Sequence, residues 1–222
     1  MIAFKTLFAA LSIGLTCAVP ARSAAPDLPA LQADPAGISV SGLSSGGFMA
    51  HQYSVTFSSE VIGAGIVAGG PFNCAGIYLA AFLTTCMTGK PAGSTSWSSA
   101  SDFSKNDVID KVANIRRQRI YLFHGTKDSV VGSGPMDAVR DFYRAAGLPA
   151  ANLVYESKAP AGHAFISTRI GDPDCGANGG DYIDRCTIAG MGYDQPGAIL
   201  RHIYGTLQPP ATQRSSTPEP FD

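Results

Sequence analysis

The sequence is poor in charge and has almost no surplus of either sign. Charged residues make up 15% of its 222 positions, and 16 Lys and Arg stand against 17 Asp and Glu, which gives a formal net charge of -1. Without a basic surplus or an acidic tail, the composition offers no support for a nucleic-acid-binding protein. A nearly neutral chain is compatible with an uncharged substrate.

Metal-binding spacings are missing as well. No Cys-x-x-Cys pair occurs and no two His lie close together, so a zinc site is not expected. Besides Cys17 there are four cysteines, an even number, and exported proteins use such sets as disulfides. Of the three possible pairings we favour the local one, which closes two short loops and joins Cys74 to Cys86 and Cys175 to Cys186.

The N-terminus has the layout of a secretory signal peptide. An apolar run at residues 7–19 follows the positive charge of Lys5 and is too short to span a bilayer comfortably. Small residues then fill the cleavage region, so we predict a leader over residues 1–23 and a secreted protein, extracellular or periplasmic. A lipoprotein site at Cys17 is the alternative, although the residues just before it fit such a site poorly.

Short apolar runs alternate with helical patterns along the rest of the chain. Strands are expected at residues 37–42, 61–68, 119–123 and 152–157, and helices at residues 47–57, 106–116, 136–146 and 197–204. This alternation predicts one α/β domain over residues 24–208, with helices packed on a mostly parallel sheet in three layers.

Three segments are expected to lack regular structure. The Ser-rich stretch at 94–104 is predicted to be a loop, and the Gly-, Asp- and Asn-rich stretch at 171–186 is predicted to be a loop closed by its cysteines. Residues 209–222 are polar and Pro-rich, which is typical of a tail or a linker.

The strongest motif is G-x-S-x-G at residues 42–46, because an expected strand precedes it and an expected helix follows it. In this setting Ser44 is predicted to occupy a strained turn that exposes its hydroxyl at the top of the sheet. Gly42 and Gly46 are expected to allow the close approach of strand and helix. The N–H of Ser45 is expected to stabilise an oxyanion. The alternative is a Ser/Gly turn without chemistry.

A serine nucleophile in this fold needs an acid and then a base further along the chain. His163 is the expected base, because it lies in a small-residue loop directly after a strand. Asp128 is the expected acid, because it follows the strand at 119–123, although Asp also favours turns for purely local reasons. The other histidines are expected to serve packing or the surface: His51, His124 and His202.

These stretches resemble the extracellular poly(3-hydroxybutyrate) depolymerases that act on denatured polymer. The resemblance runs from about residue 37 to residue 209, through SGLSSGGFMA (41–50), VAGGPF (67–72), HGTKD (124–128), GH (162–163) and CGANGGD (175–181). It implies an α/β-hydrolase fold altered by circular permutation. It also implies a triad of Ser44, Asp128 and His163 that hydrolyses polyester or oligomers through an acyl-enzyme, without a metal or organic cofactor.

The sequence departs from that family in one respect. The family places further strands after its last helix, together with a His-Gly-Cys stretch implicated in the oxyanion hole. No His-Gly-Cys occurs here, and the sequence ends at Asp222. We therefore expect an incomplete sheet, and favour a missing C-terminal segment over a second polypeptide or a working reduced sheet.

Two other functions remain open from the sequence. A carbohydrate esterase that releases feruloyl or acetyl groups would use the same triad. A secreted binding protein derived from such an enzyme would need none of the three residues to react.

Overall fold

The computed structural model describes residues 33–209. The predicted leader lies outside these residues, and so does the predicted tail from residue 210 onward. Within the described part, no helix is long and apolar enough to cross a membrane.

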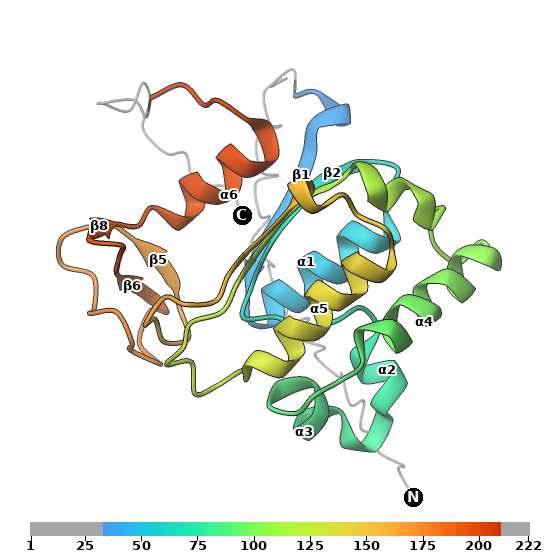
Figure 1. Cartoon of the computed structure of the whole chain (residues 1–222), viewed down its shortest axis with the longest axis horizontal. Helices are drawn as coiled ribbons and strands as arrows, with labels where there is room; N and C mark the ends of the chain where they lie inside the picture. Colours follow the sequence, from blue (N-terminus) through green and yellow to red (C-terminus); the bar gives the residue numbers. More distant parts are fainter. Residues whose placement is uncertain (1–32, 210–222) are drawn as a thin grey trace, which may run out of the picture. The chain divides into compact units, whose positions relative to one another are not determined.

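Four parallel strands form the central sheet, in the order β1-β2-β3-β4 (Figure 1). They are β1 (Ile38–Leu43), β2 (Val61–Val67), β3 (Arg119–Phe123) and β4 (Leu153–Glu156). All four strands that the sequence predicts are present. β2 is buried along almost its whole length, as its apolar run predicts for an inner strand of a parallel sheet. β1 and β4 are the outer strands of the sheet in the described part of the chain.

Helices and short strands make up the rest of the described chain. The helices are α1 (Ser45–Thr56), α2 (Cys74–Tyr78), α3 (Phe82–Met87), α4 (Gly93–Lys105), α5 (Ser133–Ala145) and α6 (Gln195–Tyr204). The short strands β5 (Phe165–Ser167) and β6 (Ile183–Arg185) pair in parallel, and β7 (Thr187–Ile188) and β8 (Met191–Gly192) pair antiparallel. Short 3-10 helices cover Pro35–Gly37, Leu79–Ala81, Val112–Arg117 and Ala150–Asn152.

Helices cover both faces of the sheet, which gives the expected three layers (Figure 1). On one face, Ile66 and Leu122 of the sheet belong to the same buried cluster as Phe142 of α5, together with residues of α1 and α4. On the other face, Tyr121 and Phe123 share a cluster with residues of α6. The buried side chains alternate between the two faces along β3, as side chains of a strand must.

The Ser-rich stretch is not a loop, and this prediction was wrong. It forms α4, whose Ser96 and Ala100 are buried. The Ser96 hydroxyl donates a hydrogen bond of 2.6 Å to the carbonyl of Phe72, and the Trp97 ring packs edge-on against Phe142 at 5.6 Å between centroids. Tertiary packing thus overrides the modest helix propensity of serine.

The helix predicted at residues 106–116 is also largely absent. Only a 3-10 helix at Val112–Arg117 forms there. Asp107 has a φ of 55°, a left-handed conformation that a continuous helix excludes and that Asp adopts more readily than most residues.

His51 of α1 is a core residue, in line with the packing role expected for it. It is fully buried, its Nδ1–H donates to the carbonyl of Gly70 at 3.1 Å, and its ring meets the edge of Phe142 at 4.8 Å. Burial lowers the pKa of His51 to about 4, and the bond to Gly70 opposes this shift only in part. The folded protein therefore holds His51 neutral at pH values where the unfolded chain charges it.

We expect the free energy of unfolding to decrease as the pH falls from 6.5 to about 4. In this window the unfolded chain binds a proton at His51 that the folded chain does not bind, so acid favours unfolding, by about 3 kcal/mol at the lower end. Urea unfolding across this pH range tests the expectation. His51→Gln keeps a donor for Gly70 and does not titrate, so its pH slope should be flatter; equal slopes in the two proteins would contradict the assignment.

Candidate active site

Ser44 lies in a strained turn between β1 and α1. Its φ of 58° and ψ of -121° are outside the regions that L-residues favour. Two backbone hydrogen bonds hold the turn: Ser44 N–H donates to Val67 at 2.9 Å, and Phe48 N–H donates to Ser44 at 2.9 Å. The conformation is the one that the G-x-S-x-G motif predicts, at the carboxyl end of β1.

The steric role of the glycines differs from the expectation at one position. A Cβ at Gly42 would lie 2.3 Å from the carbonyl carbon of Gly46, so the prediction for Gly42 is correct. A Cβ at Gly46 would meet nothing within 4 Å, so Gly46 is not needed for the close approach. The second constrained position is Gly47, where a Cβ would lie 2.7 Å from the carbonyl oxygen of Val67. The helix therefore contacts the sheet one residue later than the motif suggests.

Asp128 and His163 form a direct hydrogen bond. Asp128 follows β3, His163 follows β4, and the distance from His163 Nδ1 to Asp128 Oδ2 is 2.8 Å. Both side chains are almost completely removed from solvent, with exposed fractions of 0% for Asp128 and 3% for His163. Because a carboxylate only accepts, Nδ1 carries the proton of this bond, and Nε2 is the ring nitrogen that does not contact Asp128.

The Asp128 carboxylate is stabilised in its charged form. Burial by itself would raise the pKa of Asp128, but hydrogen bonds from His163 and from the N–H groups of Val131 and Val130 outweigh it, so the pKa is lowered. Both N–H groups donate to Oδ1 at 2.9 Å. Asp128 is therefore an anion at neutral pH and holds the His163 ring in one tautomer.

Ser44 lies at the same edge of the sheet as this pair. The carboxyl ends of parallel strands meet at one edge, and β1, β3 and β4 deliver Ser44, Asp128 and His163 there. Within the described residues no hydrogen bond joins the Ser44 hydroxyl to His163. Such bonds are often long in unliganded sites and shorten when substrate binds.

Ser45 is the first residue of α1. The N–H groups at the start of a helix have no acceptor within the helix and carry its positive dipole end. The Ser45 N–H is thus suited to an oxyanion formed at Ser44.

An apolar pocket adjoins Ser44, and the sequence did not predict it. It has a volume of about 450 Å³, and Phe48 and Met49 of α1 line it together with Phe82 and Met87 of α3. None of its lining residues is charged. One sequence feature could have indicated it. Residues 77–83 form an apolar run between Cys74 and Cys86, which is compatible with an apolar surface beside Ser44.

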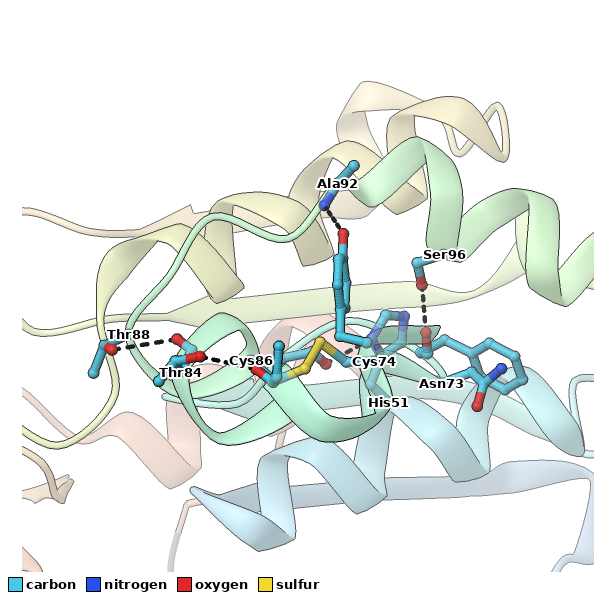
Figure 2. The surroundings of a disulfide bond; sticks show 12 residues. His51, Asn73, Cys74, Thr84, Cys86, Thr88, Ala92 and Ser96 are labelled. Atoms are coloured by element: carbon cyan, nitrogen blue, oxygen red, sulfur yellow. Dashed lines mark hydrogen bonds between the residues drawn. A yellow bond between two sulfur atoms is a disulfide. The ribbon is translucent and has the colours of Figure 1, made fainter. Parts of the chain in front are cut away.

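The two disulfides have the local pairing favoured from the sequence. Cys74 is bonded to Cys86 and Cys175 is bonded to Cys186. The first joins α2 to α3 and forms part of the pocket wall, and Figure 2 shows it beside the buried ring of His51. The second closes the segment at 171–186 as predicted, although residues Ile183–Arg185 of this segment form strand β6 and are not a loop.

The remaining histidines make structural bonds. His124 Nε2–H donates to the carbonyl of Val131 at 2.9 Å and so braces the loop that carries Asp128. His202 Nε2–H donates to the carbonyl of Asn152 at 3.1 Å. Among residues 33–209, no group of three or more His, Cys, Asp or Glu side chains is arranged to hold a metal ion.

Known proteins are similar to this chain over most of its length, although no family model matches it. The chain is 45% identical over 195 residues to a poly(3-hydroxybutyrate) depolymerase from Delftia acidovorans, and the match covers 86% of this chain and 38% of that protein. It is 35% identical over 195 residues to a polyhydroxybutyrate depolymerase from Talaromyces funiculosus, with 84% and 53% covered. A solved PHB depolymerase, a serine-to-alanine variant complexed with an R3HB trimer, is similar at a TM-score of 0.74 and 34% identity, with 85% of this chain and 57% of that chain covered.

A parallel sheet with helices on both faces and a strand–turn–helix at Ser44 define the α/β-hydrolase class. Within that class the chain is similar to poly(3-hydroxybutyrate) depolymerases over most of its own length, in line with the sequence resemblance. It spans between 38% and 57% of the length of the relatives described above.

The two motif glycines should respond to alanine in opposite directions. Gly42→Ala forces a Cβ into the backbone of Gly46 and is expected to lower the free energy of unfolding by about 1–3 kcal/mol. Gly46→Ala has room and replaces a helical glycine, so it is expected to raise that free energy by up to about 1 kcal/mol. Urea unfolding of both variants measures the difference, and equal losses would show that the close contact at Gly42 is not the constraint.

Proposed function

We propose that this chain carries the catalytic serine, acid and base of a secreted esterase that hydrolyses poly(3-hydroxybutyrate) or its oligomers. The observation that carries the proposal is the buried bond between Asp128 and His163, which leaves a basic nitrogen at the sheet edge that also presents Ser44 in a strained turn. Nothing in the packing of a sheet edge requires these three features together.

In the proposed mechanism, Ser44 Oγ attacks the ester carbonyl while His163 Nε2 takes its proton. Asp128 stabilises the resulting imidazolium. The N–H of Ser45 donates to the oxyanion of the tetrahedral intermediate. His163 then gives the proton to the leaving alcohol, and water repeats the sequence on the acyl-enzyme to release the acid and regenerate Ser44.

The pocket supports an uncharged, weakly polar acyl group as substrate. Its lining is mostly apolar and without charge, and a short hydroxyalkanoate unit presents only a methyl branch and ester groups to such a surface. The relatives named above are depolymerases of this polyester, and one of them was solved with an R3HB trimer. Export is supported by the two disulfides, which are characteristic of oxidising compartments.

A fluorophosphonate probe tests the activated serine directly, because it reacts with a serine hydroxyl only where a base assists. We expect the full chain to be labelled and Ser44→Ala to be unlabelled. Asp128→Asn should slow labelling by about 10³–10⁴-fold, since it favours the wrong tautomer of His163. Ser101→Ala on α4 is the matched control and should be labelled like the parent. Labelling that survives Ser44→Ala would refute the assignment, and an unlabelled but folded parent would favour a binding role.

Substrate class is a separate question, decided by product analysis. Once labelling has shown an activated serine, we expect untreated protein to cleave 3-hydroxybutyrate oligomers faster than feruloyl or acetyl esters of sugars. Phe82→Asp places a charge in the pocket wall and should reduce kcat/KM for the oligomers by at least about tenfold. Preferential release of ferulate or acetate would replace the polyester by a carbohydrate ester as substrate.

A further inference from the structure

Asn178 connects the loop of the acid to the loop of the base. Its Oδ1 accepts two backbone hydrogen bonds, from Ser129 N–H at 2.9 Å and from His163 N–H at 3.0 Å. Its Nδ2 donates to the carbonyl of Lys127 at 3.0 Å and to that of Gly176 at 3.1 Å. One side-chain amide therefore holds the residue on each side of Asp128 and the backbone of the base itself.

These four bonds use both donors and both acceptor positions of the amide. An amide that is fully satisfied in this way has one orientation, since exchanging its oxygen and nitrogen would oppose donors to donors and acceptors to acceptors. The side chain is consequently a fixed spacer between the two loops rather than a loosely placed surface group.

The backbone pairing of the two loops stops short of the reactive residues. Thr126 N–H donates to Ala159 at 2.8 Å, and Lys127 N–H donates to Ala161 at 3.0 Å. Both bonds come before Asp128 and before His163 along their loops. At Ser129 and at His163 the acceptor is Asn178, so this side chain continues the pairing to the positions where the side chains react.

The position of Asn178 is itself fixed. The disulfide from Cys175 to Cys186 closes its loop, and Cys175 N–H donates to Arg185 at 3.1 Å. Gly162, the neighbour of the base, packs directly on this loop, because a Cβ there would lie 1.8 Å from the carbonyl oxygen of Ala177. The loop has no room to approach the base loop more closely.

We propose that Asn178 is a positioning residue, which aligns Asp128 Oδ2 with His163 Nδ1 by bonding to the backbone of both loops. The effect of Asn178 on catalysis rests on the proposed function. Its effect on the alignment of the two loops rests on the hydrogen bonds alone. Asn178 acts only through Asp128 and His163, and no part of the mechanism gives it contact with the reacting ester.

The test measures the alignment and its consequence separately on the full chain. Asn178→Ala removes the acceptor of the Ser129 and His163 N–H groups. We expect Ser44 labelling by a fluorophosphonate to slow by about 10- to 100-fold, the range for a small misplacement of a catalytic group. We also expect the far-downfield proton resonance of His163 Nδ1–H, which reports the bond to Asp128, to weaken or move. A purely structural role would leave that resonance unchanged in the folded protein.

Two further variants serve as a control and as a second test of the positioning role. Asn106→Ala is the matched control, because it removes an exposed asparagine amide that donates to the Asp102 carbonyl at the end of α4; it should change neither readout. Asn178→Asp keeps an oxygen for the two N–H donors but places a second carboxylate oxygen against the Lys127 and Gly176 carbonyls, so it should also slow labelling and shift the His163 resonance. It replaces Asn178→Ala if that variant does not fold.

The outcomes distinguish the two proposals. A labelled parent with a folded Asn178 variant that matches it in rate and in resonance overturns the positioning role. A parent that shows the His163 resonance but no labelling overturns the proposed function, while loss of the resonance in the variant still supports the alignment by Asn178.

Discussion

Parallel pairing of the strands is the constraint on which the site depends. Because β1, β3 and β4 run the same way, the loops that leave them begin at one edge, and residues more than a hundred positions apart meet there without any long excursion of the chain. The inner strand β2 takes part without carrying a reactive side chain. Its carbonyl at Val67 accepts the N–H of Ser44 and thereby holds the strained turn against the sheet.

Several features could be predicted because the sequence carries their cause locally. Residues 61–68 and 120–123 are apolar on both faces, which is typical of buried strands. The G-x-S-x-G turn, and an Asp and a His that each follow a strand, need only the chain order and the strand positions. The structure places the Asp and the His in contact and the Ser at the same edge.

Other features depend on contacts that no local pattern contains. α4 is rich in serine, and its helix is stabilised by packing against α5 and by a bond from Ser96 to a distant carbonyl. Gly47, rather than Gly46, is constrained because of where Val67 lies in the folded chain. Asn178 bonds to Ser129 and to His163 from 49 and 15 positions away, so nothing in its immediate sequence marks its position between the two loops.

On the proposed function, the disulfide between Cys175 and Cys186 links maturation of the site to the cellular compartment. The bond forms under oxidising conditions and is rare in the reducing cytosol. A newly made chain still inside the cell would lack the covalent closure of the loop whose Asn178 bonds to Ser129, next to the acid, and to the base His163. Full hydrolytic competence would then be acquired only after export, so that the producing cell is spared an active esterase during synthesis.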